Sequence, residues 1–457
     1  MMTGKERILK TLNREPVDRP PWLPFVGCHG GYLLQKRADE YLKSADLLVE
    51  GLRVARERYQ PDGLPVMFDL QVEAEVLGCD LNWAAEVPPA VISHPLTSGS
   101  LAELPKLDPD AGRIPVVLDA LDRVKGEMGD EVALYGLLCG PFTLALHLRG
   151  NEIFLDMFDD EDQVKAIIDF AAERAMEMAG YYLDHGADVI AVVDPMTSQI
   201  SPEHFGDFVA PALNKVFKMI RDRGSFSSLF VCGDVTRNLE PMCATAADNI
   251  SVDEQIDMVT LSKLAKAHQK SIGGNLKLTA VLLLGTPEDA QREAVGIMDQ
   301  CAGAPLILAP GCDLPYATPP ENLEAVAAVV QDEYQREIVR TTKQAAKIDD
   351  YTDVQVPDYD DAPAVILDVI TLDSTSCAPC QYMLEAVERA GRATPVKTYI
   401  NEHKIKVRAG LGMMQKLGVK NLPTICIEGE PVFASIIPDQ RTLVAAIEER
   451  ARAKGLA

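Results

Sequence analysis

Two cysteines of this chain stand at the ends of apolar runs, where their thiols could take part in chemistry. Cys232 directly follows Leu-Phe-Val at residues 229–231, and Cys312 follows an apolar run at 306–310 and one glycine. A cysteine thiolate is both a ligand for zinc and a strong nucleophile. Short apolar runs of this kind are typical of buried strands. Two thiols at strand ends therefore indicate a metal site.

Three further reactive side chains occupy the same kind of position, just beyond an apolar run. Asp69, Cys139 and Asp194 follow runs that end at residues 68, 138 and 193. The repeated order of strand, polar residue, loop and helix predicts parallel βα units. In a (β/α)8 barrel the carboxyl ends of the strands face one shared mouth, where active sites are built. We therefore expect an α/β fold of the TIM-barrel type, in which these side chains and the two cysteines converge.

The bulk composition is that of a globular protein with room for more than one domain. Of the 457 residues, 47% are hydrophobic and 25% are charged, which provides ample core. The net charge of −25 opposes binding to nucleic acid or to an anionic membrane. The N-terminus has no apolar signal segment, and no run approaches the ~18 apolar residues of a membrane span. We expect a cytoplasmic protein that binds neither membrane nor nucleic acid, with its cysteines reduced.

An acidic segment divides the chain. Residues 348–364 contain six aspartates and two prolines and lack Lys and Arg, a composition typical of a solvated linker. We predict a barrel domain over residues 1–345, an acidic linker over 346–362 and a second domain over 363–457. In the first domain, helical patterns that alternate with the strands include Asp162–His185, Pro202–Arg223 and Pro319–Thr341.

The second domain carries a Cys-Ala-Pro-Cys motif at residues 377–380. The surrounding pattern predicts a strand before the motif and a helix at it, followed by a strand, a helix, a hairpin and a closing helix. The positive end of a helix favours the nucleophilic thiolate form of a cysteine. Together with Leu-Pro-Thr at 422–424, the motif resembles the thioredoxin family, whose dithiol motif is followed by a cis-proline loop. The resemblance implies a thioredoxin-like domain with redox chemistry at Cys377 and Cys380 and with Pro423 as a binding residue.

Two other interpretations of the dithiol motif stay open. A zinc ribbon would need a second Cys or His pair at close spacing, and Cys426 and His403 are the available residues. The other alternative is a thioredoxin fold that is used only for docking, although an intact cysteine pair favours redox chemistry.

Several motifs of the first domain occur in a characteristic order. Glu-Pro-Val-Asp-Arg-Pro stands at residues 15–20, Gly-Pro-Phe-Thr at 140–143, Cys-Gly-Asp at 232–234 and Gly-Thr-Pro-Glu at 285–288. In this order they resemble the uroporphyrinogen decarboxylase superfamily, and the resemblance implies a TIM-type barrel. The superfamily includes both decarboxylases and corrinoid-dependent methyltransferases, so the resemblance alone does not name a reaction.

Asp69 stands at the position that resembles the catalytic aspartate of the decarboxylase branch. That branch carries an arginine-rich motif that binds the carboxylates of its substrate, whereas the corresponding residues 25–32 contain no arginine. A strongly acidic protein without these arginines lacks the counter-charges for a porphyrinogen. A tetrapyrrole decarboxylase is therefore the alternative hypothesis.

Cys232 and Cys312 match the two cysteines of the methyltransferase branch, whose zinc site has the pattern His-x-Cys with a distant Cys. The resemblance implies that zinc holds an acceptor thiol as a thiolate. The thiolate would then attack a methyl group on the cobalt of methylcobalamin or of a corrinoid protein. However, Phe230 occupies the histidine position and cannot bind a metal. The candidates for the third ligand are Cys28 and His29, followed by Glu73 and Glu75.

Other polar residues of the predicted mouth have less specific roles. Asp69 and Asp194 would orient a ligand or act in acid–base chemistry, or else only bind loop amides, and Asn275 is expected to contact the cofactor. The leading hypothesis is a zinc- and thiolate-dependent methyltransferase that uses a methylated corrinoid and a small thiol acceptor. Its fused dithiol module would keep the barrel cysteines reduced or present Cys377 to a substrate thiol or disulfide. The alternatives are the decarboxylase and a corrinoid- or thiol-binding redox partner without methyl transfer.

Overall fold

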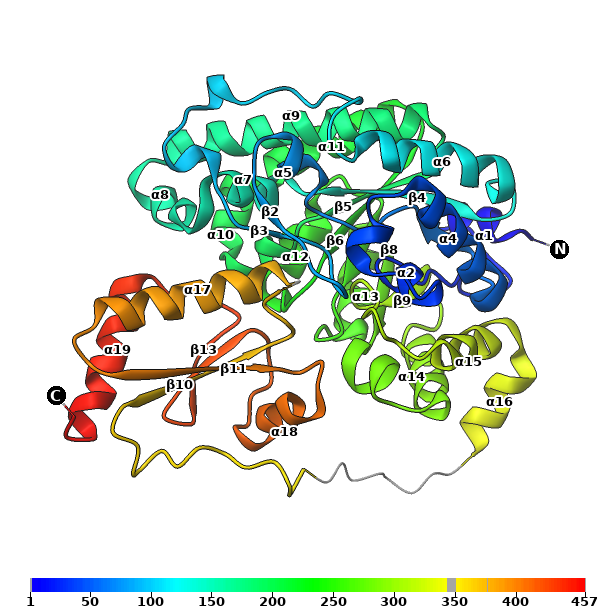
Figure 1. Cartoon of the computed structure of the whole chain (residues 1–457). Coiled ribbons are helices and arrows are strands. Elements are labelled where there is room, and N and C mark those ends of the chain that lie inside the picture. The colour runs from blue at the N-terminus through cyan, green and yellow to red at the C-terminus, as the bar shows by residue number, and fades with distance from the viewer. Residues whose placement is uncertain (1, 343–350, 376, 457) are drawn as a thin grey trace. The chain divides into compact units, whose positions relative to one another are not determined.

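The structure is a computed structural model that describes residues 2–342, 351–375 and 377–456. The chain divides into two compact units (Figure 1). The larger unit holds nearly all of the described residues before 343, and the smaller unit holds those from 351 onward. Among the described residues, no helix has the length and apolar character needed to cross a membrane.

A parallel sheet forms the centre of the larger unit, with the strand order β1-β4-β5-β6-β7-β8-β9. Its strands are β1 (Gly63–Pro65), β4 (Ala133–Cys139), β5 (Val189–Val193), β6 (Phe226–Val231), β7 (Asn249–Val252), β8 (Ser271–Leu276) and β9 (Leu306–Pro310). Trp22 links the two edges of this sheet. Its carbonyl accepts hydrogen bonds from the N–H groups of Asp62 and Gly63 at β1, and it forms a parallel bridge with Leu308 of β9. The sheet therefore curls into a barrel of the TIM type.

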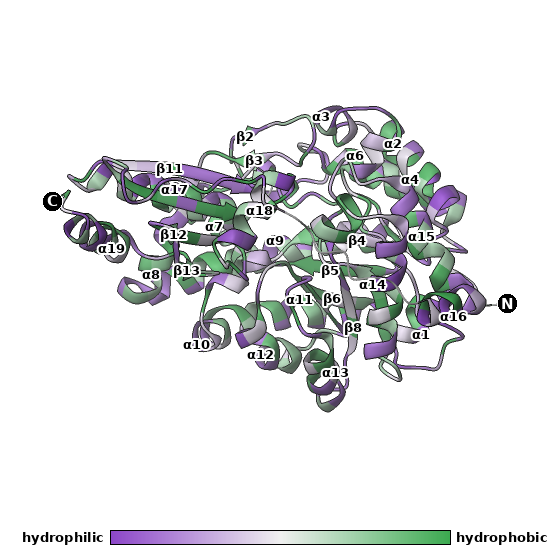
Figure 2. Ribbon diagram, turned by 90° about the horizontal axis from the view of Figure 1, so that it is seen from below, coloured by the Kyte–Doolittle hydropathy of each residue, from purple (hydrophilic) through white to green (hydrophobic). Residues whose placement is uncertain are grey.

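Helices lie around this sheet, and a short antiparallel pair, β2 (Leu81–Asn82) and β3 (Ala90–Val91), accompanies them (Figure 1). The helices are α1 (Gly4–Leu12), α2 (His29–Leu33), α3 (Ala38–Tyr41), α4 (Ala45–Tyr59), α5 (Val72–Val76), α6 (Ile114–Met128), α7 (Pro141–Arg149), α8 (Ile153–Asp159), α9 (Glu161–Asp184), α10 (Pro202–His204), α11 (Ala210–Asp222), α12 (Leu239–Ala244), α13 (Met258–Ala267), α14 (Pro287–Gln300), α15 (Pro320–Gln331) and α16 (Glu333–Thr341). Figure 2 shows hydrophobic and hydrophilic residues on the same helices, as expected for helices that cover a sheet with one face.

The strands of the barrel are buried because their sequences are apolar on both faces. Every residue of β4, β5 and β9 is buried, in agreement with the continuous apolar runs of the sequence. Side chains from several strands form one core cluster inside the barrel, which includes Phe25, Phe68 and Phe230. Cys232 and Cys312 pack against this cluster. The strand ends therefore place both thiols at the edge of the barrel core.

Two helices that the periodicity predicts as continuous are interrupted. The region 202–223 contains α10, a π-helical turn at Phe205–Val209 and α11. The region 319–341 is broken at Asp332, which leaves helical geometry and whose side chain accepts a hydrogen bond from Tyr334 N at the start of α16. An aspartate competes with the helical backbone in this way because its side chain satisfies the N–H groups of a new helix start.

The smaller unit contains a four-stranded mixed sheet with the order β11-β10-β12-β13. Its elements are β10 (Val365–Thr371), α17 (Ala378–Ala393), β11 (Thr398–Lys404), α18 (Arg408–Lys416), β12 (Thr424–Ile427), β13 (Glu430–Ala434) and α19 (Gln440–Ala453). β11 pairs with β10 in parallel, and β12 pairs antiparallel with both β10 and β13. The element order is the predicted one, and β11 pairs with β10 along its whole length. The Leu422–Pro423 peptide bond is cis.

The described part of the predicted linker, residues 351–362, packs on the smaller unit. Val354 is buried in a cluster with Ile370 and Met413, and the hydroxyl of Tyr359 donates to the buried Asp368 at 2.8 Å. This differs from a solvated linker, because apolar and aromatic side chains alternate with the acidic ones and find a surface to cover. Residues 346–350 of the predicted linker lie outside the described residues.

Candidate active site

Cys232 and Cys312 come together at the carboxyl end of the barrel. Cys232 directly follows β6, and Cys312 follows β9 after Gly311. Both side chains are half-buried and pack against the same core cluster. The neighbouring thiol of Cys312, together with burial and the nearby carboxylates of Asp253 and Asp313, raises the pKa of Cys232 well above its usual value. These surroundings therefore oppose the thiolate form of Cys232.

Phe230 belongs to an aromatic cluster in the barrel core, and the two cysteines pack against this core. Its ring stacks on Phe25 at a centroid distance of 4.8 Å and meets Phe68 edge to face at 6.1 Å. All three rings are almost fully buried. The position at which the resemblance implies a histidine ligand is therefore occupied by an apolar side chain of this buried cluster.

Asp253, which the sequence reasoning missed, lies beside Cys232. Its Oδ2 atom accepts a hydrogen bond of 3.0 Å from the N–H of Gly233, the residue after Cys232. The side chain of Asn275 donates to the carbonyls of Asp253 and Ile256, at 3.0 and 2.8 Å. Asn275 therefore holds the loop after β7, where a cofactor contact was expected. The sequence did contain a signal for Asp253, since it follows the strand residues 249–252 in the same strand-then-polar pattern.

Asp313, also missed, ties the loop after β9 to the segment that follows Trp22. Its Oδ1 atom accepts a hydrogen bond of 2.9 Å from the N–H of Gly27. A Cβ atom on Gly27 would lie 2.3 Å from that oxygen, so a larger residue there would displace the Asp313 carboxylate. The position of Asp313 directly after Cys312 was the sequence signal from which it could have been predicted.

Cys28 and His29 begin helix α2 and do not join the cysteine pair. The ring of His29 lies 2.9 Å from the carbonyl of Tyr316 through Nδ1 and 2.7 Å from the hydroxyl of Tyr59 through Nε2. Burial lowers the pKa of His29 to about 4. Within the described ranges, no group of three or more His, Cys, Asp or Glu side chains is arranged to hold a metal ion. A catalytic zinc ordinarily takes three protein ligands, so the donors present do not fit a complete zinc site in this arrangement.

Asp69 is engaged in a buried ion pair. Its Oδ2 atom lies 2.5 Å from Nη1 of Arg113, and its Oδ1 atom accepts the N–H of Gln71 at 2.8 Å. The same arginine, which the sequence reasoning also missed, binds Glu75 through Nε at 2.7 Å. Glu73 is buried beside this pair, and burial raises the pKa of its carboxyl group to about 8. Asp69 and Glu75 are therefore partners of an arginine, and neither joins the cysteine pair.

Asp194 supports the start of helix α7. Its carboxylate accepts hydrogen bonds from the backbone N–H groups of Phe142 and Thr143, at 3.1 and 2.8 Å, and from the Thr143 hydroxyl at 2.6 Å. Burial raises its pKa to about 6. The contacts are those of the loop-amide alternative, in which the carboxylate satisfies free N–H groups at a helix start.

The dithiol motif of the smaller unit is oxidised. Cys377 and Cys380 form a disulfide at the start of α17, where Cys377 is the N-cap residue. Cys377 is half-buried, whereas Cys380 is buried. The sulfur at the helix end is therefore the more accessible of the two.

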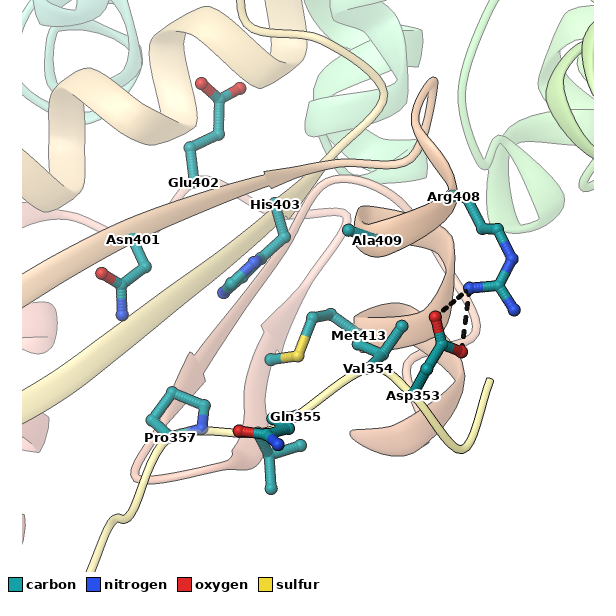
Figure 3. A pocket seen from close by; sticks show the side chains of 11 residues that line it. Asp353, Val354, Gln355, Pro357, Asn401, Glu402, His403, Arg408, Ala409 and Met413 are labelled. Atoms are coloured by element: carbon teal, nitrogen blue, oxygen red, sulfur yellow. Dashed lines mark hydrogen bonds and ion pairs between the residues drawn. The ribbon is translucent and has the colours of Figure 1, made fainter. Parts of the chain in front are cut away.

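A separate cavity of about 820 Å³ lies between residues 353–357, β11 and α18 (Figure 3). In Figure 3, Asn401 and His403 point to the same side of β11 and Glu402 points to the other. His403 Nε2 lies 2.7 Å from a carboxylate oxygen of Asp368, which also accepts from Asn401 at 3.1 Å. The wall of this cavity therefore contains a histidine oriented by a buried aspartate.

The comparisons with known proteins decide the family. The sequence profile of the family described as Uroporphyrinogen decarboxylase (URO-D) matches residues 3–333. The chain belongs to the URO-D family. The match ends before the smaller unit, and the protein is an enzyme of this family.

Relatives within the URO-D family include methyltransferases and decarboxylases. Methylcobamide:CoM methyltransferase MtbA of Methanosarcina mazei is 31% identical over 334 residues, which cover 70% of this chain and 96% of that protein. Uroporphyrinogen decarboxylase of Synechococcus sp. (strain CC9605) is 25% identical over 334 residues, which cover 70% and 94%. A solved structure of a methyltransferase from Methanosarcina mazei matches with a TM-score of 0.67 at 26% identity and covers 73% of this chain and 100% of its own. The fold of this URO-D enzyme is therefore that of its methyltransferase relatives.

Proposed function

We propose that this URO-D enzyme transfers a methyl group from a methylated corrinoid to a small thiol acceptor. The observation that carries the proposal is that Cys232 and Cys312 follow β6 and β9 at the carboxyl end of the barrel and pack against one core cluster. Its support is the similarity to methylcobamide:CoM methyltransferases over almost their whole length. The methyl donor would be a corrinoid protein or free methylcobalamin.

The residues around the pair suit such a reaction. The two thiols pack against the rings of Phe25, Phe68 and Phe230, which keep water from that side of the thiols. Asp253 fixes the turn that carries Cys232 through its bond to the N–H of Gly233. An acceptor thiol would lie beside both cysteines, with its methyl donor on the side away from the aromatic cluster.

Zinc is a separate hypothesis. Cys232 and Cys312 would hold the metal, and when bound it would keep the acceptor thiol deprotonated. This hypothesis requires a third ligand, which the described residues do not group with the pair.

The smaller unit is proposed to be a thioredoxin-like redox module of the same enzyme. Its support is the helix-capping Cys377 in a disulfide with Cys380, on a four-stranded mixed sheet with the predicted order of elements.

The decarboxylase alternative has less support. Asp69 has both oxygens engaged, by Arg113 and by the backbone of Gln71. A general acid or base needs a free oxygen near the substrate. Decarboxylase relatives are also less identical to the chain, at 25–26%, than the methyltransferase MtbA at 31%.

The test is a methyl-transfer assay with the anaerobically reduced full chain. Methylcobalamin is supplied with a panel of thiols, including coenzyme M, and the loss of the methyl–cobalt absorption is followed together with the methylated thiol. We expect turnover with the wild type and a loss of about 100-fold or more in the Cys232→Ser variant, as for removal of a central catalytic group.

Cys301→Ser is the matched control. Cys301 is also a free cysteine of the barrel, but it follows α14 on the amino-terminal side of β9. Equal activity of the wild type and the Cys232→Ser variant with every thiol would contradict the proposal. Zinc content, measured on the same samples, tests the metal hypothesis independently.

A further inference from the structure

The cavity of the smaller unit is lined by one end of a hydrogen-bonded network. Nε2 of His403 lies 2.7 Å from Oδ1 of Asp368, and the same oxygen accepts a hydrogen bond of 3.1 Å from Asn401. The other oxygen of Asp368 accepts a hydrogen bond of 2.8 Å from the hydroxyl of Tyr359. The side chain of Asp368 is fully buried, whereas that of His403 is 19% exposed. The network therefore leads from a buried carboxylate to a side chain that lines the cavity.

The buried carboxylate fixes which nitrogen of His403 carries the proton. A carboxylate only accepts hydrogen bonds, so Nε2 of His403 is the donor to Asp368. In a neutral imidazole, the other nitrogen is then an acceptor. Within the part of the chain that the structure describes, no group donates to Nδ1 of His403. A ligand in the cavity therefore meets a histidine nitrogen that can accept a hydrogen bond.

Asn401 supplies a second acceptor next to this nitrogen. Its Nδ2 atom donates to the same oxygen of Asp368 that His403 binds, and Asn401 and His403 point to the same side of β11 (Figure 3). The carbonyl oxygen Oδ1 of Asn401 is an acceptor, and none of the described residues donates to it. Two neighbouring acceptors favour a ligand group that donates hydrogen bonds.

The charges around the cavity favour a donor that is also a cation. Of the described lining residues, Arg408 carries the only permanent positive charge. Its Nη1 atom binds both carboxylate oxygens of Asp353, at 2.9 and 2.7 Å, so this charge is already paired (Figure 3). The groups that bind the carboxylate of Asp368 are neutral donors when His403 is neutral. A positive ligand group would therefore be attracted to the histidine side of the cavity.

The residues across the cavity from β11 suit an aliphatic chain. Val354, Pro357 and Met413 lie there (Figure 3), and Val354 and Met413 belong to one buried apolar cluster. The cavity volume of about 820 Å³ is within the range of sites for small molecules. A ligand with a positive donor at one end and an apolar chain at the other therefore matches both sides of the cavity.

We propose that this cavity binds an aliphatic primary amine in its ammonium form. The ammonium group donates hydrogen bonds to Nδ1 of His403 and Oδ1 of Asn401, and the chain of the ligand lies against Val354, Pro357 and Met413. The described lining residues include no cysteine, so the site is separate from the dithiol motif and from the barrel cysteines. The inference therefore does not rest on the proposed function.

The test follows the methyl signal of Met413 in the full chain. The protein is made with methionine labelled with ¹³C at the methyl group, and the Met413→Leu variant assigns the signal. Hexylamine is added at about pH 8, where imidazole side chains are ordinarily neutral. We expect the signal of Met413 to move and to saturate. Met383, which is buried in a different core cluster of the same unit, is the internal reference.

Two comparisons test the chemistry of the site. Hexanoate has the same chain with the opposite charge, and it should leave the signal of Met413 unmoved. In the His403→Leu variant, hexylamine should bind about tenfold more weakly or worse, because one hydrogen bond from a charged donor is lost.

A second variant leaves the network around Asp368 intact. Ala409 lines the cavity from α18 and is exposed, so Ala409→Phe fills the cavity without removing a buried contact. We expect this variant to lose hexylamine binding. Ala445 is exposed on α19 and does not line the cavity, and Ala445→Phe should keep the wild-type affinity. Circular dichroism verifies that both variants are folded.

Any of four results would overturn the inference. The signal of Met413 could stay unmoved by hexylamine, or hexanoate could move it equally, which would show that only the chain is recognised. Wild-type affinity in the Ala409→Phe variant would mean that the amine binds elsewhere, and wild-type affinity in the His403→Leu variant would exclude the histidine as its acceptor. No corrinoid or acceptor thiol takes part in this test, so its outcome is independent of methyl transfer.

Discussion

The carboxylate of Asp253 accepts a hydrogen bond of 3.0 Å from the N–H of Gly233, directly after Cys232. Gly233 has φ of 98°, a left-handed conformation that favours glycine. The end of β7 therefore controls the turn that carries the thiol at the end of β6. Burial raises the pKa of Asp253, and its charge contributes to the raised pKa of Cys232.

Removal of the Asp253 charge should make Cys232 more acidic. In the Asp253→Asn variant we expect the pKa of Cys232 to fall, because a nearby negative charge no longer opposes the thiolate. The measurement is the rate of iodoacetamide labelling of Cys232 between pH 6 and 10, followed by peptide mass spectrometry. Asp257→Asn, which neutralises an exposed carboxylate at the start of α13 and keeps an oxygen that can cap the helix, is the control. An unchanged pH profile of Cys232 labelling would show that the Asp253 carboxylate holds the turn but does not affect the pKa of Cys232.

Arg113 should stabilise the barrel through its buried bond to Asp69. The two side chains are 5% and 0% exposed, so Arg113→Met leaves a buried carboxylate without its partner. We expect a loss of about 3 kcal/mol in the free energy of unfolding of the barrel. The measurement is urea denaturation followed by tryptophan fluorescence. Arg123, whose side chain is 38% exposed, should change stability by about 0.5 kcal/mol or less when replaced in the same way. Equal effects of the two variants would mean that the ion pair does not stabilise the fold.

Glu73 should make the barrel less stable as the pH rises. Burial raises its pKa from 4.5 to about 8 in the folded protein, so between these values the folded state binds a proton that the unfolded state has released. Stability therefore falls with rising pH across this window, by at most about 1.4 kcal/mol per pH unit.

The Glu73→Gln variant should lack this slope, since its amide stays neutral at every pH. The free energy of unfolding is measured by urea denaturation at pH 5, 6, 7 and 8. Relative to that of the wild type, the variant's free energy of unfolding should rise from pH 5 to pH 8. The exposed Glu103, replaced by Gln, serves as the control. A variant whose pH dependence matches that of the wild type would contradict the assignment.

Tyr359 should hold residues 351–362 onto the smaller unit. Its hydroxyl donates to Asp368, which is fully buried. Although burial opposes ionisation, the hydrogen bonds from His403, Tyr359 and Asn401 keep the pKa of Asp368 below its usual value. Tyr359→Phe removes one donor from this buried carboxylate.

We expect the Tyr359→Phe variant to lose about 1–2 kcal/mol in the stability of the smaller unit. Faster proteolysis within residues 351–362 would accompany the loss. The measurements are urea denaturation and limited digestion of the full chain with the endoproteinase Asp-N, which cleaves before aspartate. Tyr399 is 41% exposed, and Tyr399→Phe should leave both unchanged. Identical behaviour of the two variants would show that the hydroxyl contributes nothing.

Most of the barrel strands could be predicted from the sequence, because the apolar runs that mark them consist of residues that are neighbours along the chain. Apolar runs such as 133–138 and 189–193 are long enough to mark strands buried on both faces, and they are buried at every position. Interruptions such as Asp332 were missed because the apolar period continues across it, while the break comes from a single side chain that satisfies a backbone N–H.

The candidate site was predictable only in part. The strand-end rule selected Cys232 and Cys312 but also selected Asp69 and Asp194, which form an ion pair and a helix cap. A position at a strand end does not reveal which partner a side chain binds. Arg113 supplies such a partner from helix α6, far from Asp69 in the sequence and without a motif of its own.

The sequence by itself determined the order of strands and helices, the two thiols at strand ends and the dithiol motif at a helix start, because each depends on residues that are neighbours along the chain. Only the tertiary structure decided that Cys232 and Cys312 pack against one core cluster, that His29 binds Tyr59 instead, and that Asp253 lies beside Cys232. Such contacts depend on barrel closure and on the direction of each side chain. Neither is encoded by spacing alone.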